Sequence, residues 1–219
     1  MSLPVSLTEY ALDIIREKIL TGEYPPGSKL QTETISKELG VSRTPVIAAI
    51  NRLVVEELAI TVPRHGTIVR KFTKDEVKDI LEARYMIELF AAPLVVNCMD
   101  NNQGRLTRME TLLGEFENIA GMSYSEANKL DSEFHTLYIE MSGNSQLVKL
   151  HRLNWSVGIT YHMFYLAKLP LETQISDYKD HRRLVDAIKA KDEAALIEVI
   201  TKNKDSNMRL IDKYLDRNG

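Results

Sequence analysis

The sequence has little of what marks secreted, membrane-spanning or fibrous proteins. Its 219 residues contain a single cysteine, Cys98, which excludes an internal disulfide framework and suits the reducing cytoplasm where we expect the protein. No apolar run approaches the length of a membrane helix, and the amino end lacks a signal-peptide pattern. Internal repeats and low-complexity segments are absent as well. These absences leave a globular protein with no expected membrane partner, long enough to form two small cores.

Positive charge is also scarce. The formal net charge is −3, which is not typical of a nucleic-acid-binding protein. Residues 1–71 hold 9 Lys/Arg against 8 Asp/Glu, and the remainder holds 19 against 23. A basic surface for DNA must therefore be local to a few side chains, namely Arg43, Arg52, Arg64, Arg70 and Lys71.

The first seventy residues carry an ordered series of short elements. Apolar residues at helical spacing predict a helix over 8–20, and a second short helix over 32–39 ends at Gly40. We expect the Ser42 hydroxyl to cap a third helix that continues to about residue 57. Helix, glycine turn and capped helix in this order indicate a helix-turn-helix.

A hairpin follows the third helix. Residues 59–62 and 67–69 alternate well enough for two strands, joined by residues 63–66. Such a wing beside a helix-turn-helix predicts DNA binding, with the amino end of the third helix against base edges in the major groove. The alternative is an ordinary helical hairpin with solvated charges, which the ordered succession of elements disfavours. The candidate DNA contacts are Ser42, Arg43 and Thr44 on the helix and Arg64, His65 and Gly66 at the wing tip.

After residue 74 the pattern is helical throughout. Breaks near residues 100–102, 121–123, 143–144 and 169–170 predict about six helices in a bundle. The sequence therefore predicts a mainly α protein in two domains. Residues 1–72 form a winged helix-turn-helix with a two-stranded wing, and residues 73–219 form an all-helical domain.

Polar residues interrupt the apolar stripes of these predicted helices. Arg84 lies in a core-facing row, where its charge needs either Glu88 one turn on or the carboxylate of a small ligand. Asp131 and His135 share one helix face, where they are either a surface pair or an oxygen and a nitrogen for one ion. His181 also falls in a core-facing row. Together they predict a polar cavity, whereas His151 is expected at the surface.

Two asparagines, Asn203 and Asn207, stand where the apolar stripe of the last helix should continue. They add a further helix to those that bring polar groups inward. Polar groups that converge from several helices are typical of a ligand site between the helices of a bundle.

Residues along the amino-terminal motif carry a family resemblance, namely Ile19, Gly22, Pro26-Gly27, Leu30, Leu39-Gly40-Val41-Ser42-Arg43-Thr44-Pro45-Val46, Leu53 and Gly66. With these residues the motif resembles the DNA-binding domain of the GntR family of bacterial regulators. The remainder resembles the FCD effector domain of its FadR-type branch, which implies that residues 73–219 serve effector binding and dimerisation. Two positions depart from the family, since Ile47 and Glu33 stand where it commonly has arginine. The resemblance implies a homodimer that binds a pseudo-palindromic operator, usually as a repressor, and responds to a small effector.

The FCD resemblance also implies a divalent metal site. Asp131, His135 and His181 match the first three ligands of the family's set, while the final histidine falls on Asn203. Oxygen and nitrogen ligands of this kind suit zinc, nickel or manganese. We expect Arg84 and Asn203 to contact a small carboxylate-type effector.

Two other functions remain open at this point. The helical domain could serve only dimerisation and bind neither metal nor effector. A metal-dependent hydrolase is the other alternative, since an open metal site can activate water. No general base beside the three ligands and no nucleophile motif is evident, so we expect no catalytic residues and no enzyme.

Overall fold

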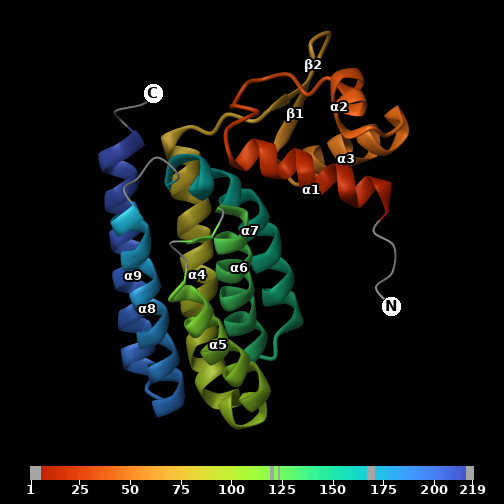
Figure 1. Cartoon of the computed structure of the whole chain (residues 1–219). Helices are drawn as coiled ribbons and strands as arrows, with labels where there is room; N and C mark the ends of the chain where they lie inside the picture. The colour runs from red at the N-terminus through yellow and green to blue at the C-terminus, as the bar shows by residue number, and fades with distance from the viewer. Residues whose placement is uncertain (1–5, 119–120, 123, 167–170, 216–219) are drawn as a thin grey trace. The chain divides into compact units, whose positions relative to one another are not determined.

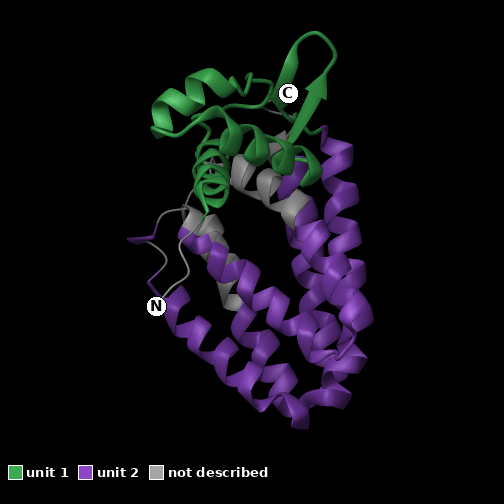
Figure 2. Ribbon diagram, turned by 90° about the vertical axis from the view of Figure 1, so that its right-hand side faces the viewer, with its two compact units in different colours: residues 1–72 green, residues 73–219 purple. Residues whose placement is uncertain are grey.

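The computed structural model describes residues 6–118, 121–122, 124–166 and 171–215. The chain divides into two compact units, residues 1–72 and 73–219, which Figure 2 colours separately. Within the described ranges, no helix is both long and apolar enough to cross a membrane. Each unit has its own core and is described by itself.

Unit 1 is a winged helix-turn-helix, which confirms the predicted fold of this part. The two strands pair antiparallel, with Ala59 opposite Val69 and Val62 opposite Gly66. Gly40 ends the second helix with a left-handed φ of 65°, which glycine adopts without strain. The elements are α1 (Leu7–Leu20), α2 (Thr32–Leu39), α3 (Arg43–Val55), β1 (Ala59–Val62) and β2 (Gly66–Val69).

Ser42 precedes α3 as predicted, but its hydroxyl does not cap the helix. A capping oxygen accepts a hydrogen bond from the second or third backbone N–H of the helix. The third residue of α3 is Pro45, which has no N–H, so one of the two usual donors is missing. The predicted side-chain cap is therefore wrong, and Ser42 is an exposed residue at the start of α3.

The core of unit 1 holds α3 in place. The apolar faces of α1 and α3 pack against each other, and β1 packs beside α3. Burial of this apolar surface is the main stabilising contribution in so small a unit. The side chains involved include Leu12, Ile15, Ile19, Val46, Leu53 and Leu58, all at most 1 % exposed.

Unit 2 is a bundle of long helices that run alongside one another in Figure 1. Thr73 and Glu76 form a reciprocal capping box that fixes the start of the first of them. That helix, α4, contacts α6, α7 and α9 and so lies at the centre of the unit. The elements are α4 (Lys74–Cys98), the short 3-10 helix η1 (Met99–Asn102), α5 (Gln103–Phe116), α6 (Tyr124–Met141), α7 (Ser145–Leu166), α8 (Leu171–Ala190) and α9 (Glu193–Leu215). The predicted break near residues 169–170 lies outside the described residues.

The core of unit 2 contains several charged and polar side chains. The Phe134 ring packs edge-to-face against His135 and His181, and the Tyr138 hydroxyl donates to the backbone carbonyl of Glu88. Since an unpaired buried polar group costs free energy, these residues have to find partners with one another or with a ligand. Among the side chains that the structure describes, the buried polar residues of α4 and of α6 to α9 are Arg84, Glu88, His135, His151, His181 and Asn207.

His151 corrects one prediction from the sequence. We expected it at the surface, but it is completely buried, at 0 % exposure. Leu150 and Leu153 of the same helix are more than half exposed instead. The polar and apolar residues of α7 do not form separate stripes, so hydrophobicity alone selects the wrong face of this helix.

Candidate functional site

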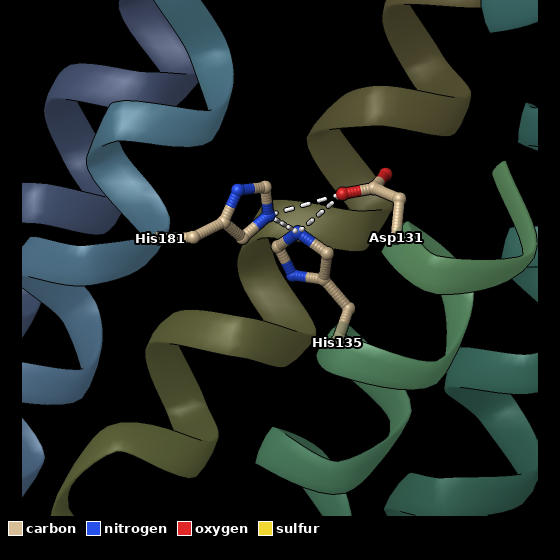
Figure 3. A group of neighbouring side chains, drawn as sticks. All are labelled: Asp131, His135 and His181. Atoms are coloured by element: carbon tan, nitrogen blue, oxygen red, sulfur yellow. Dashed lines mark hydrogen bonds and ion pairs between the residues drawn. The ribbon is translucent and has the colours of Figure 1, made fainter. Parts of the chain in front are cut away.

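Three side chains from two helices converge in the middle of unit 2. Asp131 and His135 lie one turn apart on α6, and His181 extends from α8 toward them, as Figure 3 shows. Asp131 Oδ1 lies 3.0 Å from His181 Nε2 and 3.5 Å from His135 Nε2. The two Nε2 atoms are 3.1 Å apart. Both histidines are almost fully buried, so the cluster is shielded from water.

These separations fit a metal ion. Ligand bonds of about 2.0–2.2 Å place neighbouring ligand atoms about 2.8–3.6 Å apart in octahedral or tetrahedral geometry. The three atoms of Asp131, His135 and His181 already have such spacings. Two imidazole nitrogens and a carboxylate oxygen are donors that zinc, nickel and manganese all accept. The residues present therefore suit a divalent ion.

The protonation states favour metal ligation at two of the three positions. Burial lowers the pKa of His181, so its imidazole is neutral. Burial would raise the pKa of Asp131, but its hydrogen bonds and Coulombic attraction to His135 and His181 outweigh burial and hold the pKa well below its usual range. A charged carboxylate and a neutral imidazole are the forms that bind metals.

Arg84 extends from α4 into the same cluster. Its Nε donates to Glu88 Oε1 at 2.9 Å, and its Nη2 lies 2.9 Å from His135 Nε2. Since a guanidinium only donates, His135 Nε2 accepts, and the ring carries its hydrogen on Nδ1. That nitrogen lies 3.1 Å from Glu88 Oε1. Glu88 thus pairs with both Arg84 and His135.

The charges around His135 act in opposite directions at Nε2. Burial and Arg84 lower its pKa, but Glu88 and Asp131 outweigh them and raise it, which favours a second proton on Nε2. The hydrogen bond from Arg84 requires a lone pair there instead. We assign the neutral ring, because the Arg84 donor lies nearer to Nε2 than Asp131 Oδ1 does. A metal ion at Nε2 would replace the Arg84 contact.

The two asparagines of α9 differ in their surroundings. Asn207 Nδ2 donates to the hydroxyl of Tyr85 at 2.6 Å, which accounts for its burial. Asn203 Oδ1 is buried and has no hydrogen-bond partner in the part of the chain that the structure describes. No hydrogen bond or ion pair between described residues joins Asn203 to the histidine cluster. Its role as an effector contact stays a prediction.

The cluster extends beyond the residues that the sequence indicated. His151 Nε2 lies 4.0 Å from Glu88 Oε1, and the Trp155 ring lies 4.2 Å from the Arg84 guanidinium carbon. Glu88 is the partner that its spacing to Arg84 predicted, and the hydrogen bond between them confirms it. His151 and Trp155 lie one turn apart on α7, and no pattern in the sequence set them apart.

The candidate DNA contacts of unit 1 are all exposed. Ser42, Arg43 and Thr44 form the start of α3, and Ile47 is exposed on the next turn. At the other end of the motif, the wing tip consists of Arg64, His65 and Gly66, with φ angles of 64° at Arg64 and 89° at Gly66.

Carboxylates neutralise most of the basic side chains of unit 1. Arg43 Nη2 donates to Glu33 Oε1 at 2.5 Å. The other basic residues with a carboxylate partner are Arg16, paired with Glu56, Lys18 with Glu38, Arg52 with Glu9 and Arg70 with Glu57. Between described residues, no ion pair is found for Arg64 at the wing tip.

The chain matches two known family models, in the order that the fold implies. Residues 7–69 match the model described as bacterial regulatory proteins, gntR family, and residues 79–202 match the FCD domain. The first match covers the winged helix-turn-helix, and the second covers most of the helical bundle.

Curated relatives and solved structures agree with these matches. An uncharacterised HTH-type transcriptional regulator, YdhC of Bacillus subtilis, is 27% identical over 83% of this chain and 80% of its own length. The gluconate operon transcriptional repressor of the same organism is 24% identical over 87% of this chain and 79% of its length. The structure of McbR/YncC from E. coli superposes with a TM-score of 0.78 at 21% identity, covering 95% of this chain and 98% of that one.

Proposed function

The chain belongs to the GntR family of bacterial regulatory proteins and carries its FCD domain, and we propose that it is a transcriptional repressor controlled by a small organic acid. Proteins of this family regulate transcription and are not enzymes. The observation that carries the sensing part of the proposal is the buried cluster of Asp131, His135 and His181 beside Arg84.

Unit 1 binds the operator DNA. Two copies of the chain bind the two halves of a pseudo-palindromic operator as a homodimer. Ser42, Arg43 and Thr44 at the start of α3 meet the major groove, and the exposed wing tip of residues 64–66 contacts the neighbouring backbone or minor groove. A relative named as a repressor supports this sign of regulation.

Unit 2 binds the effector, and the charges of its buried cluster indicate what the binding of an acid requires. With neutral histidines, the cluster holds one positive side chain, Arg84, and two negative ones, Glu88 and Asp131. An acid would bring one more negative charge into a buried site, which is unfavourable. When bound by Asp131, His135 and His181, a divalent ion supplies positive charge and open positions for a ligand oxygen. We therefore expect acid binding to depend on metal.

With a metal ion bound, the Nη2 group of Arg84 would need an acceptor other than His135. Its Nη2 and a metal ion cannot both use the lone pair of His135 Nε2. Once that acceptor is taken, Arg84 can donate to the carboxylate of the acid while its Nε stays on Glu88. The side chain thus needs little rearrangement to bind ligand.

A thermal-shift panel tests this function. Carboxylates, sugar acids and fatty acyl compounds are added to the full chain with and without Mn²⁺ or Zn²⁺. An acid that binds the folded protein raises the melting temperature, here only with metal present, and the same acid releases operator DNA in a gel shift. A panel without any shift, together with no stoichiometric metal by elemental analysis or titration, would contradict the proposal.

One observation favours a second candidate, a regulator whose helical unit only dimerises. Glu88 and His135 already provide acceptors for Arg84, so its guanidinium is paired without a ligand. The same panel separates the two functions, because a dimerisation domain gives no acid-dependent shift.

A further inference from the structure

One face of α7 carries buried polar atoms that form no hydrogen bond with any of the described residues. Both ring nitrogens of His151 and the indole Nε1 of Trp155 are buried and lack a hydrogen-bond partner in the part of the chain that the structure describes. The two side chains lie one turn apart, 0 % and 6 % exposed, with ring centroids 5.2 Å apart. Buried N–H groups that stay unpaired cost free energy, so this placement calls for a bound group.

These orphaned nitrogens adjoin the proposed acid site and are not among its predicted residues. The Trp155 ring lies 4.2 Å from the Arg84 guanidinium carbon and 5.0 Å, between centroids, from the His135 ring. His151 Nε2 lies 4.0 Å from Glu88 Oε1, beyond hydrogen-bond distance. A ligand whose carboxylate meets Arg84 would therefore extend along Trp155 toward His151.

The donors and acceptors of the two rings determine which ligand group could form hydrogen bonds with them. Burial lowers the pKa of His151 to about 3, so its imidazole is neutral and offers one N–H donor and one lone pair. The Trp155 indole offers a donor only. A hydroxyl group both donates and accepts, so it can pair with either nitrogen of His151 and accept from Trp155. A second carboxylate would accept only, and an alkyl chain would leave all three atoms unpaired.

We propose that His151 and Trp155 form a hydroxyl-binding subsite, so that the acid sensed by unit 2 carries a hydroxyl group close to its carboxylate. This inference rests on the proposed acid-sensing function and narrows its ligand class to hydroxy acids. Arg84 and the metal site select the carboxylate, while the two α7 side chains select against the deoxy analogue. A site with polar groups for a ligand hydroxyl rejects an analogue that leaves them unpaired.

Matched acid pairs test the subsite on the full chain with Mn²⁺ present. Lactate is compared with propionate, and malate with succinate, by isothermal titration. We expect the hydroxylated member to bind about tenfold more tightly, as two additional neutral hydrogen bonds would give. Trp155 is the only tryptophan, so its fluorescence reports separately on a ligand at the indole.

Three substitutions test whether the preference for hydroxy acids depends on His151 and Trp155. Trp155→Phe keeps an aromatic ring beside Arg84 and removes the indole N–H, together with part of the ring, while His151→Leu removes both polar nitrogens. Each removes one of the two hydrogen bonds and should reduce the preference for the hydroxy acid from about tenfold to about threefold, with deoxy-acid affinity changed by less than about threefold. His151→Gln keeps a donor and an acceptor and should retain most of the preference. Melting temperature and circular dichroism establish that each variant folds. If Trp155→Phe does not fold, the two His151 variants are sufficient to test the subsite.

The outcomes separate this inference from the function on which it rests. The subsite is overturned if both members of each pair bind equally, or if the preference for the hydroxy acid is undiminished in Trp155→Phe and His151→Leu. Its nitrogens then hold only water, and acid sensing stands. If no acid of any pair binds, acid sensing fails and the subsite fails with it.

Discussion

Arg43 and Glu33 form an ion pair at the surface that we propose meets DNA. Both side chains are more than 60% exposed, at 65% and 61%, so the pair is screened by water and contributes at most about 1 kcal/mol. A guanine edge or a phosphate can therefore take Arg43 away from Glu33. Glu33 nevertheless adds negative charge where the operator backbone approaches, and this opposes binding.

Two substitutions at this pair should act in opposite directions. Arg43→Ala should abolish preference for the operator while unit 2 remains folded. Glu33→Gln removes a repelling charge and should tighten operator binding about threefold or more at low salt, with a smaller gain at high salt. Fluorescence anisotropy with labelled operator measures both. Arg182→Ala serves as a matched control, since Arg182 is an exposed, paired arginine of unit 2. Unchanged affinity in Arg43→Ala would exclude our assignment of the recognition helix.

Asn203 offers a gain-of-function test of the metal site. The resemblance to the FCD domain implies a fourth histidine at this position, and an amide oxygen is a poorer ligand for zinc than imidazole. Asn203→His should therefore raise zinc affinity, by about tenfold or more, whereas Asp131→Ala should lower it by more than about 100-fold. Competition with a chromogenic chelator measures both affinities. Equal zinc binding by the wild type and Asp131→Ala would show that the metal is held elsewhere.

At the scale of elements, strong local signals predicted unit 1 well. The glycine that ends α2, the serine before α3 and the alternating strands each depend on a few neighbouring residues, and the observed elements start and end close to the predicted positions. The Ser42 cap failed for an equally local reason, the missing N–H of Pro45. Secondary structure of this kind follows from sequence because its causes lie within one or two turns.

The interior of unit 2 was only partly predictable. Arg84 and His181 were expected to face inward, and both are buried. The burial of Glu88 and His151 depends on which sides of α4, α6 and α7 meet, and that is decided by packing between helices far apart in sequence. On α7 the sequence offers no clean stripe, so neither His151 nor Trp155 could be assigned to the core from its pattern.

The buried ion pair on α4 gives a prediction at the same scale. Glu88 is the only carboxylate that the described contacts place on Arg84, and the pair links α4 to His135 of α6. Glu88→Gln leaves Arg84 buried without its countercharge and should lower the free energy of unfolding by about 3 kcal/mol. Urea denaturation measures the change. The control is Glu117→Gln in an exposed pair, which should cost less than about 1 kcal/mol. Equal effects of the two substitutions would mean that the α4 pair is hydrated.

At the scale of the whole molecule, the proposed function divides input and output between the two units. Arg43 lies in unit 1 and Asp131 in unit 2, so variants at these positions should separate the two activities. Arg43→Ala should lose operator binding and keep the acid-dependent thermal shift. Asp131→Ala should keep operator binding and lose the response to acid. Loss of both activities in either folded variant would argue against this division.

Coupling between the units imposes a quantitative relation. If a hydroxy acid such as malate lowers operator affinity by some factor, thermodynamic linkage requires that operator DNA lower malate affinity by the same factor. Such factors are typically about 5- to 150-fold, so both are measurable. We expect the two values to agree within error when anisotropy titrations are made with and without malate, and calorimetric titrations with and without operator DNA. In Asp131→Ala both factors should fall to one, because the acid no longer distinguishes the two states of the protein. Operator release by malate without a matching loss of malate affinity would mean that the acid competes with DNA in unit 1 and does not act through the histidine cluster.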